Sequence, residues 1–221
     1  MTPNSGISHP IYARLYDRLN RGAETSLFPP HREYLTADLR GSVLDVGIGT
    51  GSMVPYYADA RARGDRFDLH AVEPDPHMRQ QAMAAAETAD VPVEFVNARA
   101  ERLPFSRDSF DIVICSLVLC SVADLEMALS EVRRVLIDDG EFRFFEHVQS
   151  AGTRGTVEAL VSPLWRPVVG GCHIDRRTHE RIEQRFAILE METLDIGTIE
   201  TFPVHRFVRG RTGSSTPDSG S

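Results

Sequence analysis

The stretch Val43-Leu-Asp-Val-Gly-Ile-Gly-Thr-Gly-Ser52 decides the fold. Residues 43–46 predict a buried strand, and the glycines after it precede a helix predicted over 51–61. Glycine lets the chain turn sharply and lets a ligand approach the backbone closely. The spacing is G-x-G-x-G from Gly47 to Gly51, with Asp45 two residues before the first glycine. A dinucleotide fingerprint has Gly or Ala at the sixth position, where this chain has Ser52.

The flanking sequence alternates between strand-like and helix-like segments. Further strands are predicted over 67–73, 93–97, 110–116 and 140–148, and helices over 76–88 and 124–136. Two more strand-like runs, 187–195 and 200–208, predict a closing antiparallel hairpin. Strands that alternate with helices of this length predict an α/β fold with a parallel sheet covered on both faces. We expect an N-terminal part over 1–40 with short helices over 11–20 and 31–39, one domain over 41–210 and a disordered tail over 211–221.

Composition excludes several classes of function. The 221 residues carry a net charge of −8, which argues against a nucleic-acid partner. All 24 basic residues are arginine, so lysine-based catalysis is ruled out. We find no apolar run that would span a membrane and no signal peptide, and therefore expect a cytoplasmic protein. The three cysteines have no C-x-x-C spacing, which predicts free thiols rather than a disulfide framework or a zinc site.

A second acid, Glu73, follows Gly51 by 22 residues, at the end of the second predicted strand. A carboxylate at this place can accept hydrogen bonds from both hydroxyls of a ribose. Glu73 could also be an ordinary solvated carboxylate at a strand end, and Asp45 could simply cap the turn. The two acids on either side of a glycine turn together favour a nucleoside-containing ligand.

These features resemble class I S-adenosylmethionine-dependent methyltransferases over about residues 35 to 150. The resemblance rests on Asp45-x-Gly47-x-Gly49-x-Gly51, Glu73, Glu101-x-Leu-Pro-Phe105 and Ser109-Phe-Asp111. It implies a Rossmann-like, doubly wound seven-stranded sheet of order 3-2-1-4-5-7-6 with strand 7 antiparallel and an N-terminal helical lid. It also implies the cofactor S-adenosyl-L-methionine, with the site residues Asp45, Gly47, Gly49, Gly51, Glu73, Pro74, Met78, Ala100, Glu101, Ser116 and Leu117.

Within that resemblance each residue has an expected place. The three glycines approach the methionyl part, Asp45 supports its amino group, and Glu73 binds the ribose. Met78 packs on the adenine or is simply a core residue of its helix. Ala100 and Glu101 lie in the loop that reads the adenine edge, where Arg99 replaces an aspartate common in the family. Ser116 and Leu117 line the floor beneath the sulfonium.

A narrower resemblance points to the acceptor. The runs 113–122, 131–136, 144–148 and 165–172 are similar to a branch that contains animal small-thiol methyltransferases. The implied function is methyl transfer to a small lipophilic acceptor, such as a thiol, an amine or a quinol. The alternative is a degenerate cofactor-binding module or partner subunit, for which Arg99 is the feature in favour. A nicotinamide-dependent oxidoreductase is disfavoured by the position of Gly51.

His147 is the candidate catalytic base, because it falls at the C-terminal end of the fifth predicted strand, where open α/β sheets bind ligands. The alternative is a structural histidine paired with Glu146. His173 is a second candidate, and a thiol acceptor could react without a protein base. His173 and His179 fit no metal-ligand spacing, so no metal site is predicted.

Overall fold

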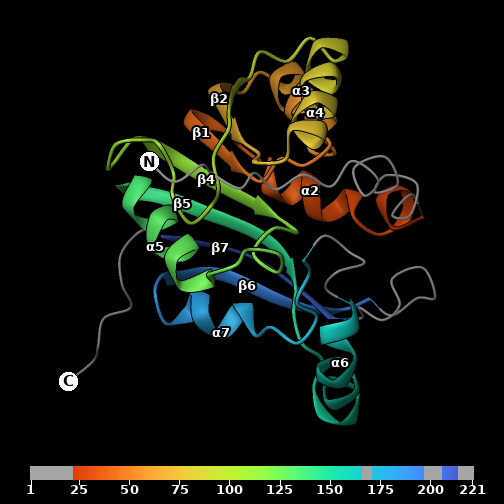
Figure 1. Ribbon diagram of the computed structural model, residues 1–221. Helices are drawn as coiled ribbons and strands as arrows, with labels where there is room; N and C mark the ends of the chain where they lie inside the picture. The colour runs from red at the N-terminus through yellow and green to blue at the C-terminus, as the bar shows by residue number, and fades with distance from the viewer. Residues whose placement is uncertain (1–21, 166–170, 197–205, 214–221) are drawn as a thin grey trace, which may run out of the picture.

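A seven-stranded sheet runs through the protein, with helices on both of its faces (Figure 1). The computed structural model describes residues 22–165, 171–196 and 206–213. The strand order is β3-β2-β1-β4-β5-β7-β6. The pairs from β3 to β5 are parallel, whereas β7 is antiparallel to both β5 and β6. This confirms the sheet implied by the family resemblance.

The elements lie close to the segments expected from the sequence. The strands are β1 (Arg40–Val46), β2 (Arg66–Val72), β3 (Glu94–Val96), β4 (Phe110–Ser116), β5 (Leu136–His147), β6 (Ala187–Asp195) and β7 (Arg206–Gly213). The helices are α2 (Pro29–Leu35), α3 (Val54–Arg63), α4 (Pro76–Thr88), α5 (Leu125–Val135), α6 (Gly152–Trp165) and α7 (Thr178–Glu183). The bounds of β4, α4 and β6 match the prediction to the residue.

Two apolar clusters hold the layers together, one on each face of the sheet. Side chains alternate along a strand, so neighbours such as Ile112 and Val113 of β4 belong to different clusters. One cluster joins the sheet to α2, α3 and α4, and the other joins it to α5 and α7. Both faces of the sheet are therefore buried, which explains why the sequence of β4 is almost continuously apolar.

Helix α2 is part of the core. It begins at the Pro29-Pro30 pair and ends at Leu35, earlier than the predicted end at residue 39. The ring of His31 stacks on Phe145 of β5 at 4.6 Å between centroids. Beneath α2, the fully buried Arg143 donates to the backbone oxygens of Leu35 and Ala37. The predicted helix over 11–20, with the proposed lid, lies outside the described residues.

The C-terminal part of the domain extends further than predicted. The sequence placed the last strand over 200–208 and a disordered tail from Arg211, but β7 runs from Arg206 to Gly213. Thr212 is fully buried, and Arg211 forms an ion pair with Glu190 of β6 at 3.1 Å. Pairing across the sheet therefore orders residues whose local composition is typical of a tail. Residues 214–221 lie outside the described part.

Helix α6 projects from the edge of the molecule (Figure 1). Its Leu160 and Leu164 side chains are among the most exposed large apolar groups. Within the part of the chain that the structure describes, no helix has the length and apolar character needed to cross a bilayer.

Candidate functional site

The glycine-rich turn lies between β1 and α3, at the C-terminal edge of the sheet. Gly47, Gly49 and Gly51 have φ angles of 75°, 60° and 93°, a region that L side chains rarely adopt. A Cβ on Gly47 would lie 2.7 Å from the γ-carbons of Val118, and one on Gly51 would lie 2.9 Å from the Cα of Ala82. A Cβ on Gly49 would meet only the backbone oxygen of Gly47, at 3.9 Å. The turn is thus packed at both ends and open in its middle.

Glu73 connects this turn to the end of β2. Its two carboxylate oxygens accept hydrogen bonds from the backbone N–H groups of Gly49, at 3.1 Å, and Asp75, at 2.8 Å. Burial raises the pKa of Glu73, and these two N–H groups oppose that rise. A carboxylate has about four acceptor positions, so each oxygen keeps room for one more donor. Two hydroxyl groups of a ligand would fill that capacity.

Asp45 lies deeper than expected. Its side chain is 1% exposed, and it accepts a hydrogen bond of 2.8 Å from the hydroxyl of Tyr57 on α3. Burial raises the pKa of Asp45 to about 7, although Tyr57 works in the opposite direction. Asp45 therefore braces the strand beneath the turn, and its predicted contact with a ligand amino group stays a prediction.

The residues expected around the adenine come from two segments. Pro74 and Met78 are half-buried at the start of α4, where Asp75 caps the helix by accepting from the N–H groups of His77 and Met78. On the other side, Ala100 is buried next to Glu101. Met78 is thus partly accessible rather than a core residue of α4.

The loop of Glu101 is tied to the start of α5. One carboxylate oxygen of Glu101 accepts from the backbone N–H of Ala123 at 2.8 Å, and the other lies 3.6 Å from Nε of Arg99. The ion pair places the charge of Arg99 against a carboxylate, so this departure from the family pattern has a local partner. The predicted adenine contact of Glu101 stays a prediction.

The loop after β4 depends on a residue whose role the sequence did not reveal. The buried carboxylate of Glu146 accepts from the N–H groups of Val118 and Leu119, each at 2.9 Å, and of Cys120 at 3.4 Å. Leu117 enters this loop with a φ of 60°, and its N–H donates to the oxygen of Phe145 at 2.8 Å. The Glu146 carboxylate is thus bonded to backbone, not to the imidazole of His147 as the structural alternative supposed.

The two predicted floor residues, Ser116 and Leu117, lie where β4 meets this loop. Ser116 is the last residue of β4, and its buried Oγ has no hydrogen-bond partner within the described residues. A left-handed backbone at a leucine such as Leu117 is strained by about 1–2 kcal/mol. Such strain collects at binding sites, because the surrounding contacts hold the loop in one shape.

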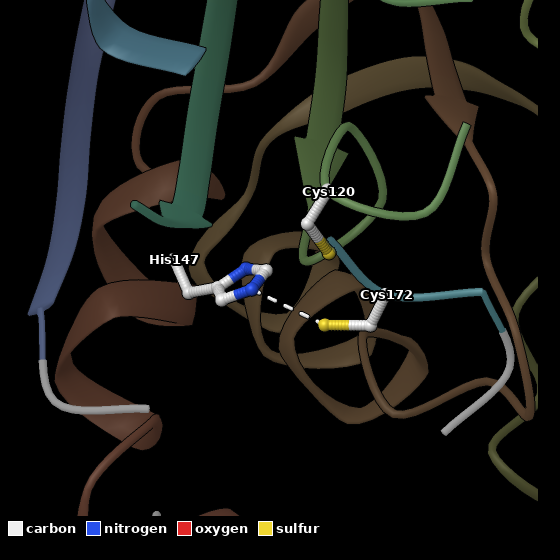
Figure 2. A group of neighbouring side chains, drawn as sticks. All are labelled: Cys120, His147 and Cys172. Atoms are coloured by element: carbon white, nitrogen blue, oxygen red, sulfur yellow. Dashed lines mark hydrogen bonds between the residues drawn. The ribbon is translucent and has the colours of Figure 1, made fainter. Parts of the chain in front are cut away.

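His147 ends β5 and meets two cysteines from other segments, as Figure 2 shows. Its Nε2 lies 3.2 Å from Sγ of Cys172, and one ligand atom from each of Cys120, His147 and Cys172 lies within 4.8 Å of the others. The hydrogen bond with Cys172 and burial raise the pKa of the Cys120 thiol. Sequence spacing gave no sign of this group, since the three residues lie in three separate segments.

The comparisons with known proteins agree with the geometry. A family model described as a methyltransferase domain matches residues 44–144. Thiol S-methyltransferase TMT1B of Rattus norvegicus is 31% identical over 188 residues, which cover 82% of this chain and 74% of the relative. Thiol S-methyltransferase TMT1A of Homo sapiens is 30% identical over 175 residues, 77% of this chain and 69% of the relative. The chain belongs to the class I S-adenosylmethionine-dependent methyltransferases.

A solved structure shows the same fold. Geranyl diphosphate C-methyltransferase from Streptomyces coelicolor A3(2), crystallised with S-adenosyl-L-homocysteine, superposes with a TM-score of 0.64 at 13% identity. The match covers 84% of this methyltransferase and 76% of that chain. Because the chain belongs to this family, its methyl donor is S-adenosylmethionine. The free acceptor capacity of Glu73 fits the ribose of this cofactor, and the open middle of the glycine turn leaves room for its methionyl part.

The raised pKa of Asp45 predicts how the stability of this methyltransferase depends on pH. The folded protein holds this proton up to about pH 7, whereas an unfolded aspartate loses it near pH 3.8. The contribution of Asp45 to the free energy of unfolding is therefore present at low pH and lost as the pH rises through about 7. Between pH 5 and pH 8 it falls by roughly 2–3 kcal/mol.

Urea unfolding of the wild type and Asp45→Asn at both pH values checks this. The amide does not titrate, so the variant should lose less stability than the wild type over the interval. Equal losses in the two proteins would mean that Asp45 has the same pKa in the folded protein as in the unfolded chain.

Proposed function

We propose that this methyltransferase transfers the methyl group of S-adenosylmethionine to the sulfur of a small, lipophilic thiol. The observation that carries the proposal is the imidazole of His147 at the end of β5, whose Nε2 already accommodates a sulfur atom, Sγ of Cys172, at 3.2 Å. A histidine at hydrogen-bond distance from a thiol is the arrangement by which proteins activate sulfur nucleophiles. The thiol S-methyltransferases among the relatives support the same acceptor.

The cofactor residues have separate roles in this proposal. Glu73 accepts from the ribose hydroxyls, and the turn from Gly47 to Gly51 holds the methionyl part. Pro74, Met78, Ala100 and Glu101 surround the adenine, and Ser116 and Leu117 lie beneath the sulfonium. Asp45 acts from below the turn, where it fixes the position of the backbone through Tyr57.

The bound cofactor supplies a methyl group on a positively charged sulfur, which leaves as a neutral thioether. The chain then has two tasks, to align the acceptor sulfur with the methyl carbon and to exclude water. Alignment of two reactants is worth on the order of 7–11 kcal/mol of the barrier. The loop from Leu117 to Leu119 is apolar, and it is fixed by Glu146, so it can serve both tasks for a lipophilic acceptor.

The choice of a thiol follows from acidity. A cysteine thiol has a pKa near 8.5, and thiols as a class are acidic enough for a single histidine to favour the reactive thiolate. An alcohol with the same carbon chain is far less acidic than the thiol. An amine with that chain is mostly protonated at neutral pH, and the protonated form is not a nucleophile. We assign His147 to the acceptor sulfur, since it is buried at the end of β5 beside the loop that lines the methyl-transfer end.

The role of Glu73 is tested by calorimetric titration with S-adenosyl-L-homocysteine. Hydrogen bonds to a charged group are worth about 1.5–3 kcal/mol each, so Glu73→Ala should weaken binding by about 10- to 100-fold or more. Glu94→Ala is the matched control, because Glu94 lies nearby on β3 with a side chain that is 67% exposed. Wild-type affinity in a folded Glu73→Ala variant would remove Glu73 from the site.

The acceptor is tested with hexanethiol, hexylamine and hexanol, which share one carbon chain. Label from methyl-tritiated S-adenosylmethionine should enter the thiol alone. His147→Ala should lower kcat by about 10²- to 10⁴-fold and leave the affinity for S-adenosyl-L-homocysteine unchanged. His179→Ala, on α7, should behave as the wild type. Transfer to the amine or alcohol but not to the thiol would refute the thiol proposal and leave the methyltransferase class intact.

A further inference from the structure

The group of Cys120, His147 and Cys172 has the composition of a metal site. Figure 2 shows the three side chains turned toward a common point from the loop after β4, the end of β5 and the segment before α7. Cys120 and His147 are 4% and 3% exposed, while Cys172 is half-buried. Within the described residues, no fourth histidine, cysteine or carboxylate joins them.

Each of the three segments is fixed by contacts outside the group, and that of His147 is held by the pairing of β5 with β7. Glu146 holds the backbone of Cys120, and the N–H of His173 donates to the oxygen of Cys120 at 2.9 Å. Arg176 donates to the oxygens of Leu119 and Val122 at 2.6 and 2.9 Å. The segment that carries Cys172 is therefore bound to the loop that carries Cys120. Such a preorganised group loses little entropy when it takes up a ligand.

The distances suit a tetrahedral ion. Zinc bonds of about 2.3 Å to sulfur and about 2.0–2.1 Å to nitrogen place ligand atoms about 3.5–3.8 Å apart. Here Nε2 of His147 lies 3.2 Å from Sγ of Cys172, and all three atoms lie within 4.8 Å of one another. A group of two thiolates and an imidazole binds zinc in preference to magnesium or calcium.

We propose that Cys120, His147 and Cys172 hold a Zn²⁺ ion whose fourth position receives the acceptor thiol. Three protein ligands with one open position are typical of catalytic zinc, whereas structural zinc has four. The proposal rests on the proposed thiol acceptor and specifies how His147 acts, as a metal ligand rather than as a free base. It assigns a role to two cysteines that the spacing had marked only as free thiols.

The position of the group suits this chemistry. Cys120 follows Val118 by two residues, and Val118 packs directly against Gly47 of the glycine-rich turn. The metal would therefore lie at the same edge of the sheet as the methyl donor. The half-buried Cys172 leaves this end of the site accessible to a small acceptor.

The reaction balances without a further reactant. On zinc binding, Cys120 and Cys172 release their thiol protons to solvent. The acceptor thiol releases its proton on taking the fourth position, because a thiol bound to Zn²⁺ is deprotonated. Its sulfur lone pair forms the new bond to the methyl carbon, and the sulfonium C–S bond breaks with its electron pair kept by S-adenosyl-L-homocysteine. The products are a neutral thioether, S-adenosyl-L-homocysteine and one proton.

The test is metal retention by the purified full chain after incubation with Zn²⁺ and removal of loosely bound ion on a weak chelating resin. The wild type should keep about one zinc per chain, and Cys172→Ser and His147→Ala should keep almost none. Cys115→Ala is the matched control, because Cys115 is a buried cysteine of β4 outside the group. It should keep zinc and activity as the wild type does.

Substitution with Co²⁺ gives a second readout that needs no activity. The wild type and Cys115→Ala should show the intense visible bands of tetrahedral cobalt and a sulfur-to-cobalt charge-transfer band. The charge-transfer band should weaken in Cys172→Ser, whose fold is checked by circular dichroism. Hexanethiol should perturb the wild-type spectrum, as expected for a ligand that enters the open position.

The outcomes separate this inference from the proposed function. A wild type that methylates hexanethiol but retains no zinc would overturn the metal site alone. Zinc retained equally by Cys172→Ser and the wild type would also overturn it. A wild type that retains zinc through these residues but methylates no thiol would support the site and contradict the proposed acceptor.

Discussion

The buried carboxylate of Glu146 is the constraint on which the site depends. A carboxylate this deep is stable only when it is hydrogen-bonded, and it meets that demand with three consecutive backbone N–H groups of the loop after β4. The loop is thereby fixed, including the strained φ of Leu117. The next residue along β5 is His147, so the same strand end sets both the loop and the imidazole.

The carboxyl ends of parallel strands lie at the same edge of a sheet. This brings the two halves of the proposed site together. Glu73 after β2 holds the middle of the glycine turn after β1, where we propose that the cofactor binds. The proposed acceptor site lies at the ends of β4 and β5. Val118 packs on Gly47, where a Cβ would collide with it, and this contact joins the halves. The turn after β1 and the loop after β4 are therefore packed directly against each other.

Short sequence patterns predicted the features of the fold and the site that depend on residues close together in the chain. The glycine spacing, Asp45 and Glu73 were recognisable because turn geometry and ligand chemistry leave a short signature, and β4 and α4 were placed to the residue. Contacts between segments that are distant in the chain leave no such signature in the sequence. The ordering of Thr212 comes from strand pairing. The sequence offered a pairing of Glu146 with His147 as an alternative, but Glu146 bonds to the backbone of a loop that lies 26 to 28 residues away in the chain. The approach of Cys172 to Cys120 depends on a segment anchored by Arg176, which no spacing rule could reveal.

The proposed function requires cofactor and acceptor to meet between the glycine turn and the group of Cys120, His147 and Cys172. A crystal structure with S-adenosyl-L-homocysteine would reveal whether they do. We expect both ribose hydroxyls within hydrogen-bond distance of Glu73 and the thioether sulfur facing that group across the loop of Leu117 and Val118. A ligand whose ribose is held elsewhere, or whose sulfur is separated from the three side chains by another element of the fold, would contradict it.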